Sequence, residues 1–284
     1  MKTGLVLEGG GMRGMYTAGV LDVFLDHQIC LDGVMGVSAG AVFGVNYLSG
    51  QRGRVIRYNL RFNGDKNYMG LRPLLRSGNI VDTEFAYSTV PRELDIFDDE
   101  AFQASAVPFY AVVTNVLTGR AEYIRIRSVF EQIEALRASA SLPFLSQPVL
   151  LDGQPYLDGG VADRIPYRKM LEMGYERLVV VLTRPEGFRE ERSRLPVELW
   201  YGRHPAFAFR LLHSHELYNA ALGELRELEK AGTVFLLRPS RPIRMERLER
   251  DPDRLREVYE MGVEDCRARL EDLRAFLQGT APRP

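Results

Sequence analysis

The 284-residue chain has few of the features that mark secreted, metal-binding or membrane-spanning proteins. Its two cysteines, Cys30 and Cys266, lie far apart and outside any metal-ligand spacing, so we expect reduced, buried thiols in a reducing compartment. No stretch approaches the ~20 apolar residues of a membrane span. Glu8 interrupts the N-terminal apolar run too early for a signal peptide. These absences predict a soluble, cytoplasmic protein.

The chain also lacks an excess of charge of either sign. Its 37 basic and 38 acidic side chains give a net charge of −1, so no overall field favours nucleic acid as a partner. An arginine-rich stretch over residues 52–72 leaves open a peripheral contact with a membrane, although a solvated helix and loop would explain it as well. A homo-oligomer is also open, because the apolar face of a helix predicted over residues 252–277 could pack on its own domain or on a second copy.

A serine stands in a predicted strand–turn–helix context. Apolar residues lead into Gly36-Val37-Ser38-Ala39-Gly40, and a helical pattern follows. This is the G-x-S-x-G pattern of a nucleophile elbow, in which Gly36 and Gly40 permit a sharp turn that exposes the serine hydroxyl. The pattern predicts Ser38 as a catalytic nucleophile.

A glycine-rich loop precedes this serine, between a predicted strand over residues 3–8 and a predicted helix over residues 15–27. The loop consists of Gly9, Gly10, Gly11, Met12, Arg13 and Gly14. Glycines this dense present backbone N–H groups, and those of Gly10 and Gly11 could form an oxyanion hole for a carbonyl held by Ser38. We therefore assign the loop to an oxyanion hole, and we expect the Arg13 side chain to be solvated or in a structural pair.

The same loop supports a second interpretation. Gly9, Gly11 and Gly14 fit the G-x-G-x-x-G fingerprint of dinucleotide binding, and Asp32 falls near the place of a ribose-binding acid. A dinucleotide-dependent oxidoreductase is therefore an alternative function. It leaves the nucleophile elbow on the next strand without an explanation.

A serine nucleophile needs a proton acceptor within hydrogen-bonding reach. The chain has four histidines: His27, His204, His213 and His215. None follows the last predicted strand, where an α/β-hydrolase carries its histidine, so a Ser–His–Asp triad is disfavoured. Asp158 ends a predicted hairpin over residues 149–157, and Gly159 and Gly160 after it would let its carboxylate point across the sheet. Burial would raise the pKa of this carboxyl group and make it an adequate base for Ser38.

Strand and helix patterns alternate along the chain and predict an α/β fold. Further strands are predicted over residues 107–115, 121–126, 178–183 and 233–237, and a further helix over residues 214–230.

Three segments resemble motifs of one family, the patatin-like phospholipases, and in particular its bacterial members. Residues 9–14 are similar to the family's oxyanion loop, residues 36–40 to its nucleophile elbow, and residues 158–160 to its catalytic acid motif. Residues 138–143 look like a further block of that family. The resemblance runs from residue 1 to about residue 185.

The resemblance implies a three-layer α/β/α fold with a mostly parallel central sheet. It also implies a Ser38–Asp158 dyad and hydrolysis of acyl esters, often of lipids, as in a phospholipase A or a lysophospholipase. It implies no metal and no cofactor. A non-catalytic lipid-binding module that has kept the site is the remaining alternative.

The resemblance ends near residue 185, and we expect the chain to divide there. Residues 1–185 form the catalytic core, and residues 186–284 form a helical and strand extension packed on the same domain. Residues 186–210 could be a lid or a packed excursion. Leu142 and Phe144 could line an acyl pocket or belong to the core.

Overall fold

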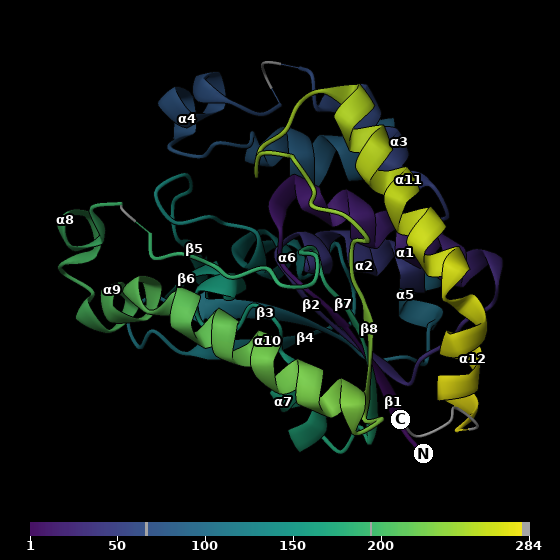
Figure 1. The fold of residues 1–284 in the computed structure, drawn as a ribbon. Coiled ribbons are helices and arrows are strands. Elements are labelled where there is room, and N and C mark those ends of the chain that lie inside the picture. Colours follow the sequence, from purple (N-terminus) through teal and green to yellow (C-terminus); the bar gives the residue numbers. More distant parts are fainter. Residues whose placement is uncertain (66–67, 194, 280–284) are drawn as a thin grey trace.

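The computed structural model describes residues 1–65, 68–193 and 195–279, and these form one mixed sheet with helices on both faces (Figure 1). The strands are β1 (Thr3–Leu7), β2 (Gly33–Val37), β3 (Phe109–Asn115), β4 (Ala121–Ile126), β5 (Val149–Leu151), β6 (Gln154–Asp158), β7 (Arg177–Val181) and β8 (Val234–Leu237). Their order is β5-β6-β3-β2-β1-β7-β8, and β4 pairs with β3. The five neighbouring strands β3, β2, β1, β7 and β8 are parallel to one another. β4 and β6 pair antiparallel with β3, and β5 pairs antiparallel with β6.

Helices cover both faces of this sheet. They are α1 (Met15–Asp26), α2 (Ala39–Leu48), α3 (Arg54–Phe62), α4 (Leu71–Ser77), α5 (Asp99–Ala104), α6 (Ile133–Ser139), α7 (Tyr167–Glu172), α8 (Val197–Tyr201), α9 (Pro205–Leu212), α10 (Ser214–Lys230), α11 (Pro252–Ala268) and α12 (Leu270–Gln278). Successive side chains of a strand point to opposite faces, so Leu5 and Leu7 pack in the cluster of α1, α2 and α11, while Val6 packs in the cluster of α7 and α10. The predicted three-layer α/β/α fold is confirmed.

Short helical segments complete the fold. Two 3₁₀ turns, η1 (Gly11–Gly14) and η3 (Gly159–Val161), follow β1 and β6, and a π-helical segment, η2 (Phe85–Leu94), contains Pro91. The predicted single helix over residues 252–277 is wrong in one respect, because it breaks into α11 and α12 at Arg269. The Arg269 guanidinium donates to the Leu236 carbonyl of β8, and α12 turns so that Phe276 packs on Phe235.

Residues beyond 185 are built onto the same sheet as the earlier part. β8 extends the parallel sheet beside β7, and α11 lies along α1 (Figure 1). The two helices are in direct backbone contact: a Cβ atom at Gly19 would lie 2.1 Å from the Tyr259 carbonyl oxygen, and one at Gly262 would lie 2.1 Å from that of Tyr16. The apolar face of α11 is therefore used within the chain itself.

One expectation about exposure is corrected. Cys30 is exposed rather than buried, whereas Cys266 is buried as expected. The arginine-rich stretch over residues 52–72 is not a free basic surface, because carboxylates engage several of its members. Arg52 pairs with Asp26, and both Arg54 and Arg57 pair with Asp95.

Candidate active site

Two strands meet end to end on one edge of β3. β2 runs along this edge until Val37 lies opposite Val112, and β6 runs towards it from the other direction until Asp158 lies opposite Val113. β4 occupies the other edge of β3 over the same residues. Because Ser38 directly follows Val37, this arrangement brings Ser38 and Asp158 together although 120 positions separate them.

The Ser38 hydroxyl donates a hydrogen bond to Asp158 Oδ2 at 2.6 Å, and each residue is only 5% exposed. Ser38 has φ 55° and ψ −123°, a strained conformation for a residue with a side chain and the one expected of a nucleophile elbow. All four histidines lie within the described residues, and none of them hydrogen-bonds to Ser38 or Asp158 or lines the adjoining cavity. The two residues predicted as a dyad therefore lie in direct contact.

Burial raises the pKa of the Asp158 carboxyl group above its ordinary value of 3.8. Hydrogen bonds from the Ser38 hydroxyl and the Gly160 N–H, together with the positive charges of Arg247 and Arg164, oppose this shift only in part. A carboxylate with a raised pKa accepts a proton from serine more readily than an ordinary aspartate does. The buried negative charge also lowers the stability of the fold at pH values above the ordinary aspartate range.

Small residues at the end of α6 and just after it hold both members of this pair by their backbones. The Ser139 hydroxyl accepts the Ser38 N–H at 2.9 Å, and the Ser141 carbonyl accepts the Asp158 N–H at 2.8 Å. From β3, the Thr114 hydroxyl donates to the Asp158 carbonyl at 2.8 Å. The sequence analysis noted residues 138–143 as a block that looks like one of the patatin-like family, but it did not identify these hydroxyl and carbonyl roles.

Glycines let the neighbouring backbones approach the dyad closely. A Cβ atom at Gly40 would lie 2.5 Å from the Leu7 carbonyl oxygen, and one at Gly36 would lie 2.5 Å from that of Gly40. At Gly159 a Cβ atom would lie 2.2 Å from the Val112 carbonyl oxygen. The elbow and the acid motif therefore have no room for larger residues at these positions.

The glycine-rich loop lies directly beside Ser38. A Cβ atom at Gly9 would come within 3.1 Å of the Ser38 Cβ, and one at Gly14 within 2.8 Å of the Ala39 Cβ. The Met12 N–H donates to the Arg247 carbonyl at 3.0 Å, so it is occupied. Within the described residues, no hydrogen bond satisfies the N–H of Gly10 or Gly11. These two groups are thus the free donors of the loop.

The dinucleotide interpretation fails at Asp32. Asp32 precedes β2, whereas the glycine-rich loop follows β1. Because the two strands are parallel, Asp32 and the loop lie at opposite ends of the strands. Asp32 instead accepts the Thr3 N–H at 2.6 Å. It holds the start of β1 and does not face the loop.

The expectation that Arg13 is solvated or paired is wrong. Its side chain is buried, 5% exposed, and Nε finds no hydrogen-bond partner in the described part of the chain. Burial, with the neighbouring guanidinium groups of Arg184 and Arg247, lowers the pKa of Arg13 to about 10. The glycine-rich loop therefore carries a buried positive charge of its own.

A buried carboxyl group that sequence reasoning missed also supports the loop. Glu8, at the end of β1, accepts the Thr183 N–H and, at 2.8 Å, the Tyr218 hydroxyl of α10. Burial raises the pKa of Glu8, and the charges of Arg164 and Arg13 oppose that shift. Since Tyr218 lies more than two hundred residues further along, no local motif could have signalled this contact.

A cavity opens at Ser38 and extends beneath the loop. Its wall includes Ser38, Gly11 and Met12 beside the dyad, and also Tyr58 and Tyr68. Leu142 also lines this cavity, which settles its role as a pocket residue. The Phe144 ring instead packs against Tyr201 and Trp200 in a separate cluster.

Comparison with known proteins places this arrangement in a defined class. A family model described as patatin-like phospholipase matches residues 5–171, which include the loop, the elbow and the acid motif. The chain is thus a hydrolase of carboxylic esters of lipids. More specifically, it belongs to the patatin-like phospholipase family. A second model, described as a domain of unknown function (DUF6363), matches residues 204–278.

Similar proteins occur in bacteria and fungi. The chain is 27% identical over 268 residues to YjjU of Escherichia coli, covering 92% of this chain and 75% of that protein. It is 28% identical over 187 residues to the lysophospholipase NTE1 of Mycosarcoma maydis, covering 64% of this chain but 10% of that protein. Among solved structures, VipD from Legionella pneumophila aligns with a TM-score of 0.47 at 12% identity, covering 95% of this chain and 67% of that one.

Proposed function

We propose that the protein hydrolyses acyl esters of lipids, as a phospholipase A or lysophospholipase does, through a Ser38–Asp158 dyad. The observation that supports this most directly is the 2.6 Å hydrogen bond between the two side chains, with no histidine beside them. The lysophospholipase name of the fungal relative points to the same substrate class.

In this mechanism Ser38 Oγ attacks the ester carbonyl carbon while its proton passes to Asp158. The N–H groups of Gly10 and Gly11 stabilise the negative oxygen of the tetrahedral intermediate. When the ester C–O bond breaks, Asp158 returns the proton to the leaving alcohol. Asp158 then takes a proton from water, whose oxygen attacks the carbonyl carbon of the acyl-enzyme. When the bond between this carbon and Ser38 Oγ breaks, Asp158 gives the proton to Oγ, and the fatty acid leaves.

A fluorophosphonate probe tests this assignment, because it phosphonylates only an activated serine. We expect one equivalent to react with the folded protein, to label Ser38, and to abolish hydrolysis of lysophospholipid; peptide mass spectrometry locates the adduct. The unfolded protein, in which Ser38 and Asp158 are separated, serves as the control and should not react. Folded protein that remains unlabelled would instead favour the non-catalytic lipid-binding module. The oxidoreductase is not favoured, given the position of Asp32.

We also propose a peripheral contact with lipid surfaces. Exposed apolar side chains gather on α4 (Leu71, 73%, and Leu75, 87%) and on α8 (Leu199, 83%, and Trp200, 61%). Met69, just before α4, and Asn79 and Ile80, just after it, line the cavity. No helix in the described ranges is long and apolar enough to cross a bilayer. Exposed leucine and tryptophan beside a lipid-binding cavity suit insertion into the interface of a bilayer.

Replacing Leu75 and Leu199 together by serine is expected to weaken binding to phospholipid vesicles about 100-fold, since burying each side chain is worth roughly 1.5 kcal/mol or more. Vesicle sedimentation measures this binding, and hydrolysis of a water-soluble ester should stay unchanged. Ile96→Ser removes a similarly exposed side chain, 64%, next to the closed end of the cavity, and provides the control. Equal binding of the double variant and the wild type would exclude this contact.

We further propose that residues 186–284 form an extension of the same domain that supports the oxyanion loop through Tyr218 and Arg247. Residues 194 and 280–284 of this extension lie outside the described residues. The contacts of β8 with β7 and of α11 with α1 support this view. They also remove the argument for a homo-oligomer, because the apolar positions of the predicted C-terminal helix are buried in the chain itself.

A further inference from the structure

The cavity follows one face of α2 away from the nucleophile. Ser38 caps this helix, and Val42 and Val45, four and seven residues further on, line the cavity. Positions spaced by four and three residues lie on one side of an α-helix, so they form a single stripe along the cavity wall. Leu136 of α6 and Val90 of η2 line the cavity as well, and the channel is therefore largely apolar.

A buried arginine lies at the far end of this stripe. Arg54, the first residue of α3, lines the cavity and is 4% exposed. Its Nη1 donates to Asn46 Oδ1 at 2.9 Å, and Asn46 is the α2 residue next to Val45. The guanidinium carbon lies 5.3 Å from the ring centre of Tyr58 and 5.4 Å from that of Phe97. Arg54 is therefore packed between two aromatic rings at the end of the channel.

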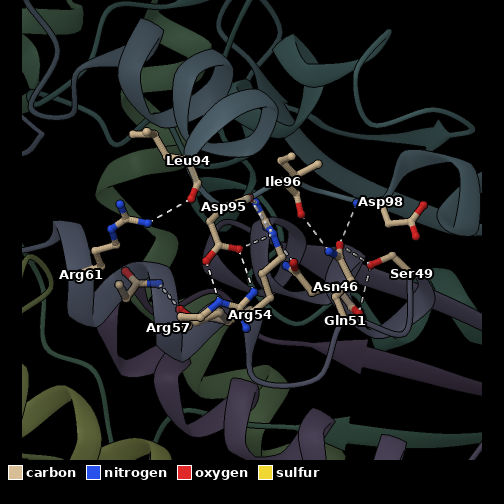
Figure 2. Close-up of polar contacts among 12 residues, drawn as sticks. Asn46, Ser49, Gln51, Arg54, Arg57, Arg61, Leu94, Asp95, Ile96 and Asp98 are labelled. Atoms are coloured by element: carbon tan, nitrogen blue, oxygen red, sulfur yellow. Dashed lines mark hydrogen bonds and ion pairs between the residues drawn. The ribbon is translucent and has the colours of Figure 1, made fainter.

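This end is held rigidly by polar contacts (Figure 2). Arg54 Nε donates to the Asp95 carbonyl at 3.1 Å and lies 3.2 Å from Oδ1 of the same residue. From the solvent side, the Arg57 guanidinium donates two hydrogen bonds of 2.7 and 2.9 Å to the Asp95 carboxylate. Arg61 donates to the Leu94 carbonyl, and Gln51 donates to that of Ile96. The loop from η2 to α5 is thus tied to α2 and α3 at several points.

An alkyl chain cannot displace the Arg54–Asp95 pair at the end of the channel. Two guanidinium groups share one carboxylate, so a net positive charge stays at the floor of an apolar channel. Pushing it aside would break buried hydrogen bonds to charged groups, each costing roughly 1.5–3 kcal/mol. Leucine or methionine in this place could change rotamer, but the tethered ion pair cannot.

We infer that this cavity binds the acyl chain of the substrate and that the Arg54–Asp95 pair limits its length to about ten carbons. The inference rests on the proposed ester hydrolysis at Ser38. Asn46 follows Ser38 by eight residues, so at 1.5 Å per residue the floor lies roughly 12 Å along the α2 axis. An extended chain advances about 1.2 Å per bond, which allows roughly ten bonds in that distance.

The test is a series of p-nitrophenyl esters that differ only in acyl length. For the wild type, kcat/KM should rise up to about fourfold per methylene to roughly ten carbons and then fall, because each buried methylene adds about 0.8 kcal/mol until the floor is reached. Val45→Phe should move the optimum down by a few carbons. Val42→Phe, which lies closer to Ser38, should move it further, to about four carbons, since its position is roughly 6 Å along the axis.

Leu48→Phe provides the matched control, because Leu48 belongs to α2 but does not line the cavity, and its profile should equal that of the wild type. Arg54→Met should relax the cut-off and admit longer chains; Arg57 still compensates Asp95, and a thermal melt checks that the variant is folded. If the optimal chain length is unchanged in both valine variants, or shifts equally in both, the inference is overturned. Hydrolysis of the short esters shows in each case that the variant is active. Loss of hydrolysis of every ester by the wild type would overturn the proposed function instead.

Discussion

Replacing Ser38 with alanine is expected to lower kcat/KM for a butyryl ester by at least ~10⁴-fold, the scale of nucleophile removal in serine hydrolases. The hydroxyl is the atom that forms the acyl-enzyme, and no other side chain of the described residues donates a hydrogen bond to Asp158. The purified variant should keep the far-ultraviolet circular dichroism of the wild type. Turnover at the wild-type rate would show that Ser38 is not the nucleophile.

Asp158→Asn is expected to lose activity to a similar extent, because an amide cannot accept the serine proton. The same substitution should increase the stability of the fold at neutral pH, although it removes the activity. Burial raises the pKa of Asp158, so the folded state binds this proton more tightly than the unfolded state does. The stabilising contribution is therefore complete below the ordinary pKa of 3.8 and is lost as pH rises through the raised pKa. At neutral pH the asparagine variant should melt at a higher temperature than the wild type.

Two readouts thus separate a catalytic role of Asp158 from a structural one. A residue that merely holds the fold would lose stability together with activity when it is replaced. An inactive variant with a higher melting temperature has lost a catalytic group whose buried charge destabilised the fold. A variant that is inactive and also melts lower at neutral pH would contradict the role we assign to this carboxylate.

A third large effect is expected from a single added methyl group. Gly159→Ala places a Cβ atom 2.2 Å from the Val112 carbonyl oxygen, and both backbones are fixed by the pairing of β3 with β6. The clash can be relieved only if the end of β6 moves away from β3, and Asp158 moves with it. We expect a loss of about 3 kcal/mol in the free energy of unfolding and a loss of ~10²-fold or more in kcat/KM.

Denaturant unfolding and ester kinetics measure the two effects of Gly159→Ala. Gly223→Ala is the matched control, since Gly223 lies in α10 and a Cβ atom there meets nothing within 4 Å. Alanine favours a helix over glycine by about 1 kcal/mol, so this variant should gain stability and keep full activity. Wild-type kinetics of Gly159→Ala would mean that the position of Asp158 tolerates a shift of the strand.

The sequence predicted those parts of the site that depend on local backbone geometry. Glycines mark the elbow at Ser38 and the turn after Asp158, because only they fit where a backbone turns sharply or passes close to another. Strand boundaries were also predictable within one or two residues, since continuous apolar runs mark strands that are buried on both faces. The meeting of Ser38 and Asp158 followed only from the joint occurrence of the motifs.

Contacts between distant segments could not be predicted. Whether Asp32 faces the loop depends on which end of its strand it occupies, and a glycine fingerprint alone does not distinguish the two ends. Arg13 is buried by elements far along the chain, and charge alone suggested solvent. Arg54 likewise appeared as one member of a basic stretch, although its partner Asp95 lies 41 residues further on. Pairing of this kind leaves no periodic signal.

The dependence of the oxyanion loop on late residues has a consequence for biosynthesis. All three motifs of the proposed site have been translated by residue 160. At that point Tyr218, the partner of Glu8, and Arg247, whose carbonyl accepts the Met12 N–H, have not yet been synthesised. A nascent chain on the ribosome therefore carries its complete chemistry without the framework that aligns it. We therefore expect a chain that stops before Tyr218 to lack the support of the oxyanion loop and to hydrolyse lipid esters poorly, although it contains Ser38 and Asp158.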